Sequence, residues 1–190
     1  MCRKKCKLLN EKNEFYNDGK IDENLYHRQW LEYTAQIEFP LIGILEIKSN
    51  VELDIASLTF TNVNLYLYHP FEDYPAQAII SEYNKKTQEI LLKQIFVPLY
   101  LRRCGLGELI FKIWLKIIYQ FSCEYGWSVS KIWGNIGHGD IYTPKISKKL
   151  YRKMHNYKYD DDRYLQLNKR EFKTHRIEYT FSNKKSLYLF

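Results

Sequence analysis

The stretch QIFVPLYLRRCGLGELIFKIWLKIIYQFSCEY, residues 94–125, decides the fold, because it predicts a strand, a short basic turn and a long helix. Ile95 and Val97 alternate with polar Gln94, which is the period-two pattern of a strand. Pro98 has no N–H to donate to a sheet ladder. The strand is therefore expected to end or bulge at that residue.

The helix that follows the turn is the most regular pattern in the chain. Apolar side chains recur at positions 106, 109, 110, 113, 114, 117, 118 and 121. This spacing draws one apolar stripe along a helix, with the polar residues on the opposite face. Gly126 is well suited to end the helix.

The turn between strand and helix combines positive charge with small residues. Arg102 and Arg103 precede a helix start, where several backbone N–H groups have no partner within the helix. Gly105 and Gly107 have no Cβ, so we expect a ligand to approach the backbone there. The pattern predicts a phosphate or pyrophosphate site. The alternative is an ordinary strand-to-helix turn whose glycines serve only close packing.

Two common phosphate loops do not fit this turn. A P-loop needs Gly-Lys-Ser/Thr, whereas Gly107 is followed by Glu108, and the dinucleotide fingerprint needs a third glycine where Ile110 stands. The spacing Arg-x-x-Gly-x-Gly after a strand instead resembles the GNAT N-acetyltransferase superfamily. Val97, Arg102, Gly105 and Gly107 match its cofactor motif. The motif's Pro-x-Tyr is absent, and a proline stands one place early at position 98.

The resemblance implies that acetyl-CoA is the cofactor and that its pyrophosphate lies on this turn. The arm of the cofactor would enter between two splayed parallel strands and bond to backbone groups of the first. Cys104 is expected to contribute only its backbone N–H, because no sequence signal makes it a nucleophile. The cofactor-binding residues implied in this way are Ile95, Phe96, Val97, Arg102, Arg103, Cys104, Gly105, Leu106, Gly107, Glu108, Asn135 and Ser147.

The rest of the chain predicts a mixed α+β fold. Apolar alternation indicates strands within 37–60 and over 63–67, then a hairpin formed by 76–83 and 88–97. A strand at 128–135 is expected to lie parallel to the 90–97 strand, because a helix crosses over between them. The predicted architecture is a GNAT-like central mixed sheet, mostly antiparallel and flanked by helices, with two parallel strands splayed at the cofactor site.

The same patterns give the domain organisation. Residues 1–20 read as a flexible N-terminal extension, and 21–190 as a single domain. Helices are expected at 22–36 and at 144–155, the second with Thr143 as its N-cap. Near the C-terminus, a strand is expected at 163–167, followed by a hairpin formed by 177–181 and 186–190.

Candidate catalytic residues rest on less specific signals. The resemblance implies that Tyr151 protonates the departing sulfur, and its ordinary pKa of about 10 lies near that of a thiol. Transfer would be direct, in a ternary complex with an amine. The general base is open among Glu82, Glu89 and His138, the last because imidazole titrates in the right range. Each of the three is also explained as a solvated surface group.

The composition of the chain limits which partners and which cellular compartment can be expected. The chain of 190 residues has a formal charge of +7, which indicates either an acidic partner such as nucleic acid or a drift in composition toward lysine. No apolar run reaches the ~18 residues of a membrane span. Four cysteines without framework spacing indicate a reducing, cytoplasmic environment. No metal site is expected.

The acceptor is not determined. A small molecule, a protein and aminoacyl-tRNA all remain candidates, and a homodimer is an open alternative. Basic residues surround the candidate tyrosine in the helix at 144–155, which favours an RNA-directed acetylating enzyme of the toxin type or simply a solvated helix face. The imperfect match after Tyr151 also leaves a non-catalytic GNAT-like binding module open.

Overall fold

The computed structural model describes the chain over separate ranges. These are residues 5–17, 28–39, 43–54, 60–68, 76–84, 86–126, 128–135, 143–155, 157–158, 163–168 and 176–183. The catalytic candidate His138 and the expected last strand at 186–190 lie outside them.

The described residues form a mixed α+β fold built on one nine-stranded sheet with the strand order β1-β2-β3-β4-β5-β6-β7-β9-β8. The strands are β1 (Lys7–Asn17), β2 (Arg28–Phe39), β3 (Gly43–Asp54), β4 (Phe60–Tyr68), β5 (Ala76–Asn84), β6 (Glu89–Ile95), β7 (Lys131–Asn135), β8 (Arg163–Leu167) and β9 (Arg176–Asn183). The helices are a short 3-10 turn η1 (Leu99–Leu101), α1 (Leu106–Tyr125) and α2 (Thr143–Lys153).

Strands β1 to β6 form an antiparallel meander, and β6 pairs with β7 in parallel. The predicted hairpin around 84–87 and the parallel strand after the helix are thus confirmed. The parallel pair needs a long crossover, which α1 supplies. Helix α1 ends at Tyr125, and Gly126 follows it with φ +67°, as its position in the sequence predicted.

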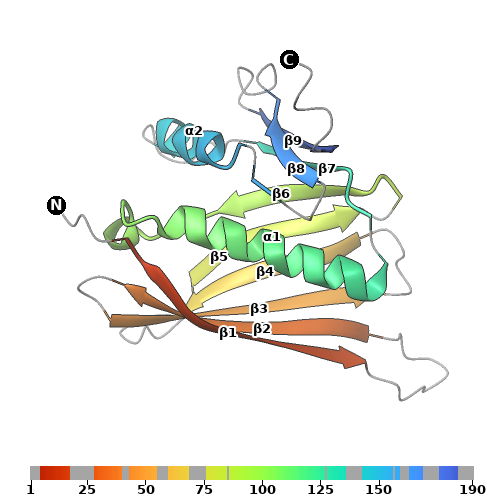
Figure 1. The fold of residues 1–190 in the computed structure, drawn as a ribbon, viewed down its shortest axis with the longest axis horizontal. Coiled ribbons are helices and arrows are strands. Elements are labelled where there is room, and N and C mark those ends of the chain that lie inside the picture. Colours follow the sequence, from red (N-terminus) through yellow and green to blue (C-terminus); the bar gives the residue numbers. More distant parts are fainter. Residues whose placement is uncertain are drawn as a thin grey trace.

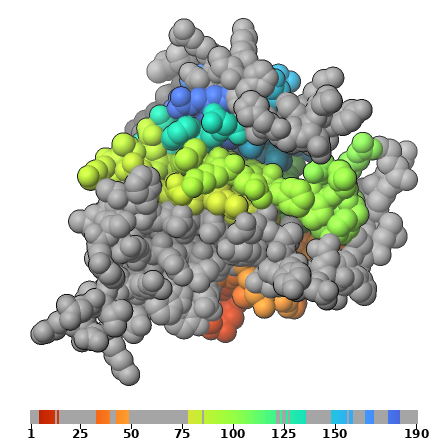
Figure 2. Space-filling view, turned by 180° about the vertical axis from the view of Figure 1, so that it is seen from behind, coloured from red at the N-terminus to blue at the C-terminus, as the bar shows by residue number. Residues whose placement is uncertain are grey.

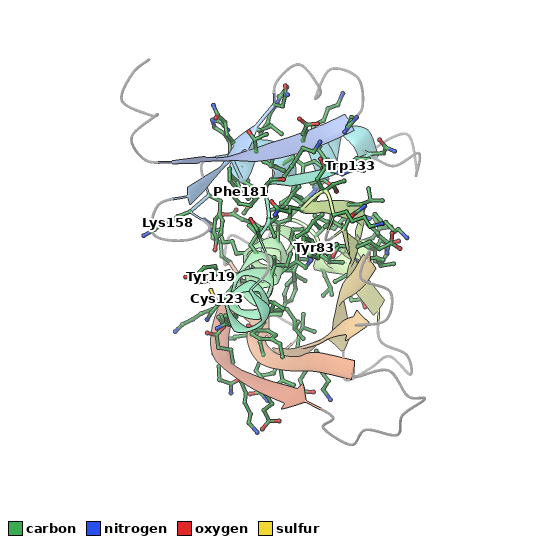
Figure 3. All side chains as sticks on the ribbon, turned by 90° about the vertical axis from the view of Figure 1, so that its right-hand side faces the viewer. Tyr83, Tyr119, Cys123, Trp133, Lys158 and Phe181 are labelled. Carbon is green, nitrogen blue, oxygen red and sulfur yellow. The ribbon has the colours of Figure 1, made fainter. Side chains whose placement is uncertain are left out.

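The sheet curls around α1 (Figures 1 and 3). Trp114 of α1 donates from Nε1 to Ser81 Oγ of β5 at 3.1 Å, and the Phe111 ring packs against Tyr179 of β9. On a third side, Lys116 forms an ion pair with Glu11 of β1. Because strands contact α1 from three directions, Phe111 and Leu115 are buried although they lie outside the predicted apolar stripe.

Two predictions about the N-terminal third are wrong. Residues 7–17, expected within a flexible extension, form edge strand β1 along β2. The helix expected at 22–36 is contradicted by β2, which occupies 28–39. Tyr33, Ala35, Ile37 and Phe39 are buried in alternation, so the period-two pattern assigned only from Ile37 onward begins at least four residues earlier.

The parallel pair brings two backbones very close. A Cβ added at Gly134 of β7 would stand 2.4 Å from the carbonyl oxygen of Leu92 on β6, nearer than side-chain carbons approach a backbone oxygen. We therefore predict that Gly134→Ala lowers the free energy of unfolding by about 1–3 kcal/mol, because the two strands must separate. Urea denaturation measures the change.

Thr180→Ala is the control for this prediction. Thr180 is exposed on β9 opposite Lys131 of β7, and its loss is expected to change the free energy of unfolding by about 0.5 kcal/mol or less. Equal stability of Gly134→Ala and the unmodified protein would show that β6 and β7 do not approach as described.

Candidate functional site

The turn between β6 and α1 has an unusual backbone. After the 3-10 turn at Leu99–Leu101, Arg103 has φ +71° and Gly105 has φ +84°. An arginine in this left-handed region carries a cost of about 1–2 kcal/mol. Two left-handed residues on either side of Cys104 fold the chain back so that α1 can start at Leu106.

The two glycines of the turn have different roles. Gly105 is required by its positive φ, and a Cβ there would meet only Lys5 Cγ, at 4.0 Å. A Cβ on Gly107 would instead point at the side chains of Val97 and Leu150, each 3.6 Å away. The Cα of Gly107 therefore faces side chains of the protein, and its expected role in ligand binding stays a prediction. Glycine is thus required at position 105 by its backbone conformation, whereas a Cβ at position 107 would meet only ordinary contacts.

Three basic side chains surround the turn. Arg102 Nε donates to the Val97 carbonyl oxygen at 2.7 Å, which holds the half-buried guanidinium beside the end of the strand. Arg103 is exposed. Lys5, also exposed, is brought to Gly105 because the Cys6 N–H donates to the Cys104 carbonyl at 3.0 Å. The position of Lys5 could not be predicted from the sequence, because a contact across about a hundred residues leaves no local pattern.

The side chain of Glu108 serves the packing of the two helices. It forms ion pairs with Lys112 in the next turn of α1, at 3.0 Å, and with Lys153 of α2, at 3.5 Å. The hydrogen bond from Lys112 is the main cause that lowers the pKa of the Glu108 carboxyl. Any contribution of Glu108 to an anion site thus comes from its backbone N–H, which has no acceptor within the first turn of a helix.

Strands β6 and β7 pair over only three residue pairs, from Glu89↔Lys131 to Leu91↔Trp133. Lys93 is an extra residue in β6, between Leu92 and Gln94, where the pairing with β5 shifts. Such a bulge bends its strand and increases its twist. Both strands continue past the last pair, β6 to Ile95 and β7 to exposed Asn135. The parallel pair thus loses its ladder on the side that leads to the turn.

Two backbone groups expected to bond the cofactor already have partners in the protein. The Phe96 N–H donates to the Ala78 carbonyl at 2.7 Å, and the Val97 carbonyl accepts from Arg102 Nε. Ile95 is half-buried, whereas the Phe96 side chain is 41% exposed. An arm bound along this segment would therefore rely on the remaining N–H and carbonyl groups of Ile95–Val97.

Helix α2 brings Tyr151 to the start of α1, because the adjacent Leu150 packs on Gly107. Tyr151 is only 6% exposed, and its ring meets that of Tyr179 with centroids 6.5 Å apart. The Tyr179 hydroxyl donates to the Tyr151 carbonyl at 2.6 Å, which fixes this point of α2 against β9. Burial raises the pKa of the Tyr151 hydroxyl well above its usual range. The phenol therefore stays protonated at neutral pH and can act only as a proton donor.

The two carboxylate candidates for the general base, Glu82 and Glu89, do not lie beside Tyr151. Ser81 and Tyr83 contact α1 and the residue Ser128 that follows it, so Glu82 between them points to the other face of the sheet. Glu82 pairs there with Lys93, and Glu89 pairs with Lys131 at 2.8 Å. Figure 2 shows β5, β6, β7 and β9 at the surface of this far face. In Figure 3, Trp133 of β7 lies on the opposite side of the molecule from Tyr119 and Cys123 of α1.

The remaining candidates are less well defined. The backbone of Ser147 lies in α2, but its side chain is outside the described set, as is all of His138. Within the described ranges, no three His, Cys, Asp or Glu side chains gather closely enough to hold a metal ion. Neither helix in that part of the chain is both long and apolar enough to cross a bilayer.

No protein-family model, curated protein or solved structure matches this chain.

The different roles of the two glycines can be tested by one methyl group at each position. Gly105→Ala is expected to lower the free energy of unfolding by about 1–2 kcal/mol, because alanine is strained at φ +84°. Gly107→Ala should be neutral or raise it by up to about 1 kcal/mol, because the methyl group meets ordinary contacts and favours the helix. Denaturant unfolding of both variants measures this. If Gly107→Ala were less stable than Gly105→Ala, the different roles given to the two glycines would be wrong.

Proposed function

We propose that the protein is an acetyl-CoA-dependent N-acyltransferase that moves an acetyl group to a primary amine by direct transfer in a ternary complex. The observation that carries the proposal is the junction of three elements. Strand β6 leads through a basic, left-handed turn into α1, and α2 packs Leu150 on the first turn of α1 and so brings Tyr151 beside it. This is the arrangement that the resemblance to the GNAT superfamily implies.

The turn suits the pyrophosphate of coenzyme A. The N–H groups of Leu106, Gly107 and Glu108 open α1 and have no acceptor within the helix, so they are donors for an anion. Arg103 and Lys5 add exposed positive charge. The carboxylate of Glu108 does not oppose an anion strongly, because Lys112 and Lys153 neutralise it.

The end of the parallel pair suits the arm of the cofactor. The ladder stops after Leu91↔Trp133, and the backbones of Gly134 and Leu92 still lie close together one residue further on, so room for the arm would begin beyond Leu92. An extended ligand beside Ile95–Val97 would use backbone groups in the manner of a short additional strand. Bound acetyl-CoA would supply an activated acyl group as a thioester.

Tyr151 is the proposed proton donor to the leaving thiolate. The phenol is protonated at neutral pH, and its fixed ring has little orientational freedom to lose. Burial raises its pKa above that of a thiol, which makes it a weaker acid than a free tyrosine. The base that deprotonates the amine stays a prediction. Among the three candidates His138 is preferred, since Glu82 is paired with Lys93 on the other face of the sheet and Glu89 is paired with Lys131.

An RNA-directed form of this activity is the second candidate. The net charge of +7 and exposed Lys149 and Arg152 on α2, the helix of Tyr151, favour an acidic acceptor such as aminoacyl-tRNA. Lys153 on the same helix is engaged by Glu108. A non-catalytic binding module of the same fold is the third candidate. Turnover of acetyl-CoA separates it from the other two.

Acetyl-CoA at about 100 times its dissociation constant is predicted to stabilise the protein by roughly 2.7 kcal/mol, or about 5–10 °C in unfolding midpoint. Arg103→Gln should weaken binding by about three- to tenfold, because an exposed cation beside the turn is lost. Thermal unfolding with increasing acetyl-CoA gives both results. Lys86→Gln is the matched control, since Lys86 is exposed at the opposite end of β6.

No shift in the unmodified protein would contradict the proposed cofactor. An equal loss of affinity in Arg103→Gln and Lys86→Gln would place the anion away from this turn. Binding of RNA without any response to acetyl-CoA would favour the non-catalytic module.

Tyr151→Phe is predicted to lower kcat by about 10²–10⁴ and to leave the acetyl-CoA-induced shift unchanged, because the ring contacts stay and only the proton donor is lost. Tyr157→Phe, at a half-buried ring that follows α2 and lies under the Lys112 side chain, is the control. Thiol release with a panel of amines measures turnover. An active Tyr151→Phe variant would remove Tyr151 from the mechanism.

A further inference from the structure

The N-terminal strand and the basic turn meet at two cysteines. The Cys6 N–H donates to the Cys104 carbonyl at 3.0 Å, one residue before β1 begins and two residues before α1 begins. Both cysteines are present as thiols. Cys104, in the turn, is 9% exposed, and Cys6 is half-buried, so both thiols are largely shielded from solvent.

The hydrogen bond gives these residues the spacing of neighbouring strands. Residues opposite each other on neighbouring strands have Cα atoms roughly 4.5–5.5 Å apart, and the single bond between Cys6 and Cys104 holds them at a comparable separation. Disulfide-bonded cysteines have Cα atoms usually about 4.4–6.8 Å apart. The side chains are also close enough to sense each other, because a thiolate at Cys104 adds to the effect of burial, which raises the pKa of Cys6 to about 11. Closing a bond between them requires little movement of the backbone.

We propose that Cys6 and Cys104 form a reversible disulfide site that joins β1 to the turn under oxidising conditions, with a low-molecular-weight disulfide such as oxidised glutathione as the oxidant. One cysteine attacks a sulfur of the oxidant, and a first thiol leaves. The second cysteine attacks the mixed disulfide and displaces the second thiol. Two protein thiols are oxidised to one disulfide, and the oxidant is reduced to two thiols.

The disulfide would have two consequences that follow from its position. It would close a loop from Cys6 to Cys104 that includes β1 to β6, a size at which a cross-link removes much freedom from the unfolded chain. It would also fix Cys104 between the left-handed residues Arg103 and Gly105. The inference goes beyond the proposed activity and does not depend on it.

The test uses the full chain with Cys2 and Cys123 replaced by serine, so that only Cys6 and Cys104 remain. After incubation with oxidised glutathione, intact mass is expected to fall by two hydrogen atoms, and a peptide linking the two cysteines should appear. Because the pKa of Cys6 is about 11, little thiolate is present at pH 8, and incubation should last hours. Protein carrying glutathione on single cysteines, without the link, would overturn the proposal.

The unfolding midpoint gives a second readout. The linked form should unfold on the order of 10 °C higher than the reduced form, and dithiothreitol should reverse the rise. Cys6→Ser and Cys104→Ser in the same background should show no rise with the oxidant. A link formed without any rise in midpoint would mean that the bond strains the fold, and would overturn the inference that the backbone already holds the two cysteines at disulfide spacing. Neither readout uses acetyl-CoA. The absence of a disulfide would therefore not count against the proposed acetyltransferase activity, and the absence of activity would not count against the disulfide.

Discussion

Enclosure of α1 by the curled sheet is the constraint on which the rest of the structure depends. Trp114 bonds to β5, Phe111 meets β9, and Lys116 reaches β1, so one helix fixes the positions of edge strand β1, central strand β5 and β9, which lies next to the other edge. A helix buried on one stripe could rotate or slide at modest cost. One contacted from three sides has a single position, because protein interiors are packed as closely as crystals.

That position also determines the geometry of the turn. The chain leaves β6 on one side of the sheet and must enter α1 within about ten residues, which the left-handed Arg103 and Gly105 make possible. The strained arginine persists because both ends of the turn are held by packing. Helix α2 then rests on the start of α1 through Leu150. The position of α2, the helix that carries Tyr151, is thus a consequence of how α1 is enclosed.

The sequence was informative where a pattern is local. Periodicity and glycine position predicted α1, its end at Gly126, the hairpin around 84–87 and the parallel β7, because each depends on neighbouring residues. It failed for β1, whose residues alternate weakly and gain their place from β2 and α1. The side of the sheet on which Glu82 lies, and the contact of Leu150 with Gly107, could not be predicted either, because both depend on how distant elements pack. Lys5 reached the turn by the same kind of long-range contact.

The salt bridge between Glu11 and Lys116 spans 105 positions in the sequence, and it has a meaning for the order of folding. Contacts at such separation require a large loop to close, so they form late and slow the search for the native state. Strand β1 is synthesised before β2 and α1, yet the surface on which it packs forms only when those two elements have come together. Until then one flank of α1, with Leu109 and Ile113, stays open to other chains. The step most exposed to misassembly is therefore the docking of the first strand.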